Sequence, residues 1–116
     1  MDRRKLRYRL EWFAQQAKVV AKSVLQGNNS YAAEERPRLD QARADVLEIL
    51  PARDHKAAIA NLDAIVEFAG IIEQYRWDAW NARRNADKMR YKAEADLQET
   101  EIERLIVEVS GHIGHQ

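Results

Sequence analysis

The chain contains no cysteine, and only two of its 116 residues are proline. The absence of cysteine excludes disulfides and thiolate metal sites. Because small secreted domains are more often cross-linked, we expect a cytoplasmic protein. No run of about 18 uncharged apolar residues occurs, which predicts that no segment spans a membrane. The basic N-terminal residues are not followed by an apolar segment, so we expect no signal peptide.

Strand signals are also missing. No segment alternates apolar and polar residues over the length of a strand, and β-branched residues are scattered. Hydrophobic residues make up 46% and charged residues 33%, which is typical of a soluble globular domain. We therefore predict an all-α protein, an antiparallel bundle of three to four helices with a long C-terminal helix or helical hairpin. The bundle is expected to occupy residues 1–110 as one domain, followed by a flexible tail at 111–116.

Apolar residues recur at intervals of three and four in the first part of the chain, which predicts a helix at residues 3–26 with Asp2 as its N-cap. A second helix is expected to begin near Tyr31, or to restart at Pro37, and to end at Leu50 before the second proline. The predicted buried positions of the first helix are Leu6, Leu10, Phe13, Ala17, Val20 and Val24. Those of the second helix are Leu39, Ala42, Val46 and Ile49.

The last half of the chain, residues 54–110, contains one glycine and no proline. As a single helix it would span roughly 85 Å, whereas the usual helix has about 11–12 residues. Its apolar face also changes, from the face of Leu62 to the opposite face near Ile72 and back. We therefore expect either one long bent helix or two helices, with Gly70 and residues 81–85 as candidate breaks.

The formal net charge is zero, but the charges are unevenly distributed. Residues 1–26 carry seven basic and two acidic side chains, and residues 81–92 carry five basic and one acidic. Residues 93–116 carry six acidic side chains and one arginine. Such asymmetry indicates either a surface for nucleic acid or an acidic protein, or acidic and basic segments of one chain that lie side by side.

The stretch YRWDAWNARRNADKMRYK, residues 75–92, combines aromatic and basic side chains. On a continuous helix its two tryptophans share a face with Arg84, opposite a stripe of alanines that would admit a neighbouring helix. That face either points outward, where Trp, Tyr and Arg are typical of binding hot spots, or is the buried middle of the stripe that begins at Ile59. The candidate protein-binding residues are Trp77, Trp80, Arg83, Arg84, Lys88 and Tyr91.

A second basic cluster opens the chain beside Tyr8 and Trp12, in the manner of a generic phosphate-binding segment. Cations at a helix N-terminus oppose the helix dipole, so an acidic group should offset them. That group is either the acidic run at residues 94–108 of the same chain, an acidic protein, a nucleic acid or an anionic membrane surface. The candidate residues for nucleic-acid or acidic-partner binding are Arg3, Arg4, Lys5, Arg7 and Arg9.

Signals for catalysis are weak. The sequence has no P-loop, no GxGxxG, no Glu-x-x-His pair of the di-iron type, and no serine or cysteine nucleophile beside a histidine. His112 and His115 have ligand-like spacing, but no third ligand is near them in the sequence. We therefore expect that the protein is not an enzyme and that it holds no metal and no cofactor.

These features favour a non-catalytic helical protein, a monomer or a homodimer, that acts by binding another protein. Small cysteine-free helical chains with split charge suit regulators and inhibitors, among them phage and mobile-element accessory proteins that inhibit nucleic-acid-targeting systems. One alternative is a nucleic-acid-binding protein, which requires residues 3–9 and 83–92 to lie on one surface. The other is a structural dimer that self-associates through the apolar seam of the first helix and the long last segment.

Overall fold

The computed structural model describes residues 2–113, and the side chains of residues 2–111. This part of the chain forms an all-α bundle without strands, as the sequence predicts. None of its helices is both long and apolar enough to cross a membrane. The elements are α1 (Arg3–Leu25), α2 (Asn29–Glu48), the 3-10 helix η1 (Ala52–Asp54), α3 (His55–Asn81) and α4 (Asn85–Ile113).

Side-chain caps fix the ends of the first two helices. Asp2 caps α1 as predicted, because its carboxylate accepts hydrogen bonds from the backbone N–H groups of Arg4 at 2.9 Å and Lys5 at 3.3 Å. After α1, the chain turns at Gly27, whose φ of 72° is a conformation that glycine adopts without strain. Asn28 then caps α2 by accepting a hydrogen bond from the backbone N–H of Tyr31 at 3.1 Å.

The second helix begins at Asn29, near Tyr31 as one of the two predictions had it, and it continues through Pro37 without a restart. Pro37 is exposed, as is Ala33, so water can hydrogen-bond to the carbonyl oxygen of Ala33 that has no N–H donor on the proline. The helix ends at Glu48 rather than at the residue before Pro51.

Residues 54–110 form two helices and not one. The break lies within the predicted stretch 81–85, where Ala82 adopts an extended backbone with φ −69° and ψ 136°. Gly70, the other candidate break, lies inside α3. The helix α4 continues to Ile113, past the start of the tail predicted at residues 111–116, whereas residues 114–116 lie outside the described part of the chain.

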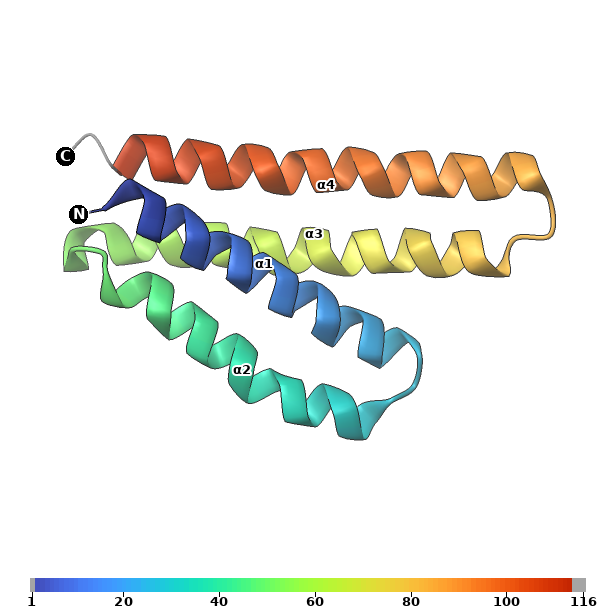
Figure 1. Ribbon diagram of the computed structural model, residues 1–116, viewed down its shortest axis with the longest axis horizontal. Helices are drawn as coiled ribbons and strands as arrows, with labels where there is room; N and C mark the ends of the chain where they lie inside the picture. The colour runs from blue at the N-terminus through green and yellow to red at the C-terminus, as the bar shows by residue number, and fades with distance from the viewer. Residues whose placement is uncertain (1, 114–116) are drawn as a thin grey trace.

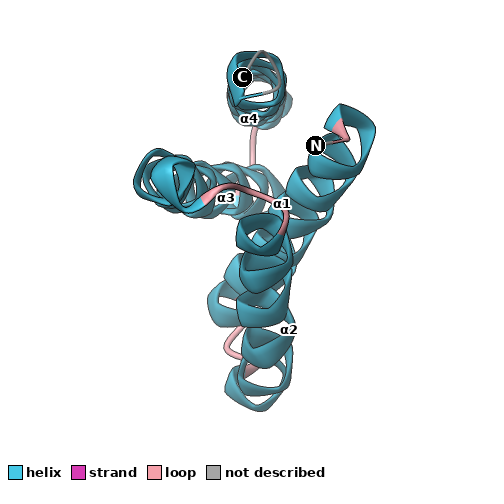
Figure 2. Ribbon diagram, turned by 90° about the vertical axis from the view of Figure 1, so that its left-hand side faces the viewer, coloured by secondary structure: helices cyan, strands magenta, loops and turns pink. Residues whose placement is uncertain are grey.

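The four helices pack in three layers. Figure 2 shows α1 and α3 in the middle, with α4 on one side and α2 on the other. The helix α1 contacts all three other helices, whereas α2 packs mainly against α1. The hairpin of α3 and α4 is the longest part of the molecule, which measures 50 by 30 by 20 Å, and it extends past the turn that joins α1 and α2 (Figure 1).

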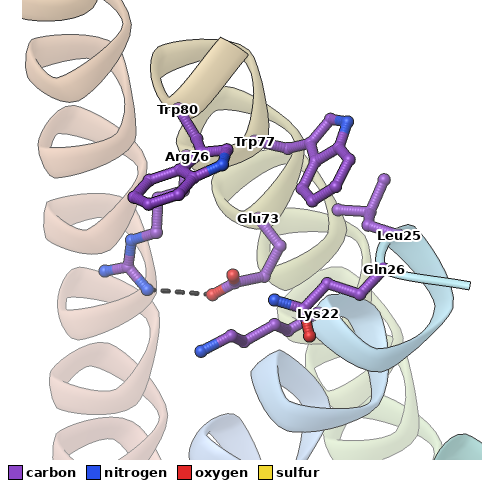
Figure 3. A pocket seen from close by; sticks show the side chains of 7 residues that line it. All are labelled: Lys22, Leu25, Gln26, Glu73, Arg76, Trp77 and Trp80. Atoms are coloured by element: carbon purple, nitrogen blue, oxygen red, sulfur yellow. Dashed lines mark hydrogen bonds and ion pairs between the residues drawn. The ribbon is translucent and has the colours of Figure 1, made fainter. Parts of the chain in front are cut away.

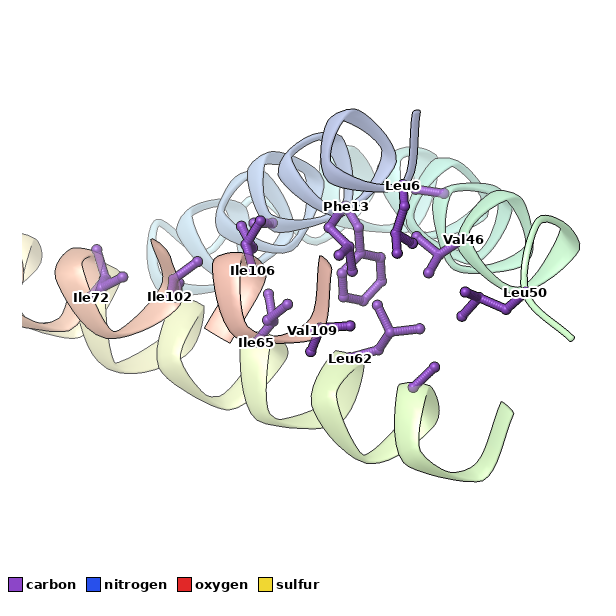
Figure 4. Close-up of a cluster of buried hydrophobic side chains, with 14 of the residues drawn as sticks. Leu6, Phe13, Val46, Leu50, Leu62, Ile65, Ile72, Ile102, Ile106 and Val109 are labelled. Atoms are coloured by element: carbon purple, nitrogen blue, oxygen red, sulfur yellow. The ribbon is translucent and has the colours of Figure 1, made fainter. Parts of the chain in front are cut away.

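Every helix contributes to one apolar core (Figure 4). Phe13 of α1, Val46 of α2, Leu62 of α3 and Ile106 of α4 are each at most 2% exposed. The predicted seam of α1 is buried from Leu6 to Val20, and only its last member, Val24, is exposed. The core therefore lies at the end of the molecule where all four helices overlap.

We expect the substitution Phe13→Ala to lower the free energy of unfolding by about 3–5 kcal/mol, because it removes the largest buried side chain of the core and leaves a cavity. Urea unfolding followed by circular dichroism measures this change. The exposed Val66 of α3 provides the control, since Val66→Ala should change stability by no more than about 0.5 kcal/mol. Equal effects of the two substitutions would contradict the position of the core.

Candidate functional site

The face of α3 that α1 covers continues past the end of α1. Leu62 and Ala69 on this face are fully buried, whereas Trp80, eleven residues after Ala69 and about three turns further along, is 80% exposed. Figure 1 shows why: α1 ends before α3 does. The sequence therefore placed Trp80 on the correct face of the helix, but the interpretation that this face is buried there is wrong, because α1 ends before it covers Trp80.

We call residues 76–92 the tip; it comprises the end of α3, the connection at residues 82–84 and the start of α4. The tip carries six basic and two acidic side chains. Its exposed apolar residues include Met89, which is 71% exposed, and Trp77, which is 37% exposed. The alanine stripe that was expected to admit a helix is buried at Ala79 but exposed at Ala86. The tip thus offers apolar surface and positive charge together.

A pocket with a volume of about 370 Å³ lies where the tip meets the end of α1 (Figure 3). The two tryptophans line one end of it, and the aliphatic side chain of Leu25 lies opposite Trp77. The pocket is lined by Lys22, Leu25, Gln26, Glu73, Arg76, Trp77 and Trp80. The pocket therefore combines indole and aliphatic surface with charged and polar groups.

An ion network fixes the base of the tip to the rest of the bundle. The side chain of Glu73 is only 7% exposed, and it accepts a hydrogen bond from Nη1 of Arg76 at 2.8 Å. The Nη2 atom of Arg76 reaches Oε1 of Glu99 on α4 at 2.6 Å. Lys18 of α1 donates to both oxygens of Glu99 at 3.1 Å. Two cations and two anions from three helices therefore neutralise one another beneath the pocket.

Three of the predicted protein-binding cations keep their charge unpaired. Arg83 and Arg84 are exposed and Lys88 is partly exposed, and none of them forms an ion pair with the described part of the chain. All three lie near the N-terminus of α4, where a cation opposes the helix dipole. Asp87 is the only acidic residue in this first turn. The end of the hairpin is therefore an electrostatically favourable place for a negatively charged group.

Tyr91 has a structural role that the sequence did not reveal. It lies on α4, so it does not continue the tryptophan stripe of α3, and its half-buried ring packs against Tyr75 with centroids 6.3 Å apart. Arg90 lies over the same ring at 5.0 Å from its centroid. The hydrogen bond to Tyr91, with the charge of Asp87, raises the pKa of Arg90. Tyr91 therefore joins the two helices of the tip, and its ring is only partly available to a partner.

The N-terminal basic cluster is partly used inside the chain. Arg7 pairs with Glu11 at 3.0 Å and with Glu103 of the acidic run, and these contacts raise its pKa. Arg9 donates to the backbone oxygen of Asp45 at 2.6 Å and pairs with Glu48 at 3.3 Å. Arg7 therefore reaches the acidic run at residues 94–108, as one interpretation of the sequence expected, whereas Arg9 pairs with an acidic residue of α2. The side chains of Arg3, Arg4 and Lys5 are exposed.

A smaller pocket of about 220 Å³ lies beside this cluster, lined by Tyr8, Arg9, Trp12, Ala42 and Asp45. The two basic segments lie far apart. The N-terminus and the tip are at opposite ends of the molecule in Figure 1. Residues 3–9 and 83–92 therefore do not form the single surface that the nucleic-acid alternative requires.

No group of three potential metal ligands occurs among the residues that the structure describes. His55 is close to the backbone, with its Nε2 atom 3.0 Å from the carbonyl oxygen of Leu50. The side chain of His112 and all of His115 lie outside the described residues.

Comparisons of the chain with protein-family models, curated proteins and solved structures found no match. The candidate site is therefore defined by its geometry.

Sequence reasoning missed the residues that shape the larger pocket. Lys22 and Glu73 are 51 residues apart in the chain, and each resembles many other charged residues on helices. They come together because α1, with 23 residues, ends beside the last turns of α3, which has 27 residues. No pattern of neighbouring residues indicates such a relation between two helices. The only useful sequence signal was the pair of tryptophans.

We expect Trp80→Phe to remove the most red-shifted and most quenchable part of the tryptophan emission, because Trp80 is the most exposed of the three indoles. Steady-state fluorescence with acrylamide measures this. Trp77→Phe should remove emission that is less accessible to the quencher. A blue-shifted, protected contribution from Trp80 would show that this face is covered.

We expect Glu99→Gln to destabilise the protein by about 1–3 kcal/mol, because it removes the charge that holds both Lys18 and Arg76. The side chain of Lys18 is only 12% exposed, so water compensates poorly for the loss. Thermal and urea unfolding measure the change. Glu67, an exposed residue of α3, is the control, since Glu67→Gln should be nearly neutral. Equal stability of the two variants would contradict a stabilising role of the network.

Proposed function

We propose that this protein is not an enzyme and acts by binding another protein through the tip, as a regulator or inhibitor of that partner. The observation that carries the proposal is Trp80, a tryptophan 80% exposed at the edge of a pocket and close in sequence to the unpaired Arg83 and Arg84. Exposed apolar side chains are common one at a time on protein surfaces. On the tip, however, Trp80 is accompanied by a second exposed indole, Trp77, and by the exposed Met89.

The chemistry of the tip suits a protein partner. Tryptophan and arginine are the residue types that most often dominate binding energy when they enter a pocket of the partner. An indole also has few rotatable bonds, so ordering it in an interface costs little conformational entropy. The cations of the tip would steer an acidic surface toward it and fix its orientation. The expected partner surface is therefore acidic around an apolar recess.

The tip is held firmly enough to present these groups. The ion network of Glu73, Arg76, Glu99 and Lys18 joins its base to α1, and the rings of Tyr75 and Tyr91 pack between its two helices. A preorganised surface loses less entropy when it binds. A small protein of this kind would regulate or inhibit its partner by covering the partner's own binding surface.

The two alternatives receive less support from the packing. The apolar seam of α1, which suggested self-association, is buried against the other helices of the same chain. The basic segments, which suggested nucleic-acid binding, are at opposite ends of the molecule (Figure 1). The tip differs from both features, since its aromatic and basic groups lie together and are exposed.

We expect Trp80→Ala to weaken binding of the natural partner by about 2 kcal/mol or more, a loss of about 30-fold in affinity, because it removes the proposed hot spot without touching the core. The measurement compares proteins retained from source-cell extract by immobilised wild type, Trp80→Ala and Trp12→Ala, quantified by mass spectrometry. Trp12 is the matched control, an exposed tryptophan of α1 away from the tip. Retention that depends on Trp12, or on neither tryptophan, would refute the proposal.

A further inference from the structure

The side of α4 that faces α1 changes its charge along the helix. Glu103 and Glu99 lie on this side, since they pair with Arg7 and Lys18 of α1. Lys92 precedes Glu99 by seven residues, which is close to two full helical turns and returns to the same face. Lys88 precedes Glu99 by eleven residues, close to three turns. One stripe of α4 is thus acidic beside α1 and basic toward the tip.

The change of charge coincides with the end of α1. Arg7 and Lys18 of α1 match the acidic half of the stripe. Toward its end α1 runs away from α4 (Figure 1), and on the basic half Lys92 is exposed and Lys88 partly exposed. Lys88 and Lys92 form no ion pair with any described residue. The same surface of the hairpin is therefore complementary to a basic helix at one end and to an acidic helix at the other.

The α3 side of the same surface is apolar. Trp80 continues the face of α3 on which α1 packs, and it is exposed where α1 is missing. The pocket at the end of α1 opens beside Trp77 and Leu25, where it could receive an apolar side chain (Figure 3). Lys22 lines the same pocket and has no ion pair with the described part of the chain. A cationic edge and an aromatic edge thus run side by side beyond α1.

We propose that this surface binds an acidic amphipathic helix of a partner protein, which lies along the exposed face of the tip beyond the end of α1. The inference rests on the proposed function and names the structure and charge of the partner. Apolar residues of that helix, three or four positions apart, cover Trp80 and enter the pocket beside Trp77. Its carboxylates face Lys88 and Lys92, in the way that the cations of α1 face Glu99.

A helix fits this surface better than a nucleic acid does. The hairpin already packs one helix, α1, closer to the core, so a second helix would use the same kind of contact. Lys88 and Lys92 also lie on one edge, beside the edge that carries the two tryptophans, which is the arrangement that an amphipathic helix requires.

The test uses two labelled 18-residue peptides and the full chain. Both peptides have leucine at helical spacings of three and four; one carries glutamate and the other lysine at all remaining positions. Fluorescence anisotropy at low salt should show that the glutamate peptide binds at least ten-fold more tightly than the lysine peptide. The double variant Lys88→Glu and Lys92→Glu should reverse this preference. The control variant, Arg4→Glu and Lys5→Glu, has the same change of charge at the opposite end of the molecule. It should keep the preference for the glutamate peptide.

Three results would overturn the inference. The first is equal binding, or no binding, of the two peptides by the wild-type chain. The second is a single-stranded oligonucleotide that binds where the glutamate peptide does not and is lost in the Lys88→Glu, Lys92→Glu variant, which would assign the surface to nucleic acid. The third is a dimer in sedimentation experiments that the same variant abolishes, which would assign it to a second copy.

These outcomes are separate from the test of the proposed function. If the natural partner is lost with Trp80→Ala while the glutamate peptide does not bind, protein binding through the tip stands and the acidic helix is wrong. If the peptide binds but partner retention does not depend on Trp80, the surface recognises acidic helices and the proposed function is wrong. Circular dichroism of each variant confirms that the bundle is folded.

Discussion

The unequal lengths of the packed helices determine most of what is distinctive in this molecule. The core forms where all four helices overlap, with Phe13 at its centre, and the hairpin of α3 and α4 continues beyond that overlap. A helix face that is apolar along its whole length must then be exposed at one end. Trp80 lies at that end, and the pocket is the step between the last turn of α1 and the hairpin. The candidate site follows from this one constraint.

Electrostatics follow the same division of the molecule. In the overlapping part, charges from different helices neutralise one another, as Lys18, Arg76 and Glu99 do at the base of the tip. Beyond α1 the positive charges of Arg83, Arg84 and Lys88 have no counterpart within the described chain. Ion pairs at the surface contribute little to stability, so unpaired cations are tolerated without unfolding the protein. Their concentration beside exposed indoles is the basis of the proposed role of the tip in recognition.

Local sequence patterns predicted the helices well, whereas features that depend on how the helices pack against one another could not be predicted from the sequence. The N-cap at Asp2 and the seam from Leu6 to Val20 depend on neighbouring residues, so the sequence alone was sufficient for α1. The break after α3 was harder, because nothing local distinguishes residues 81–85 strongly from Gly70; the halves of the hairpin select it by packing against each other. The exposure of Trp80 depends on where α1 ends, and the residues around Trp80 in the sequence carry no information about that.

The most direct test of this account is hydrogen exchange of backbone amides along α3, measured by NMR. The account predicts slow exchange at residues 62–72, which α1 and α4 cover, and exchange at least ten-fold faster at residues 76–81, where α1 is absent. Uniform protection along the whole of α3 would contradict it, because another part of the chain or a second copy would then cover the tip.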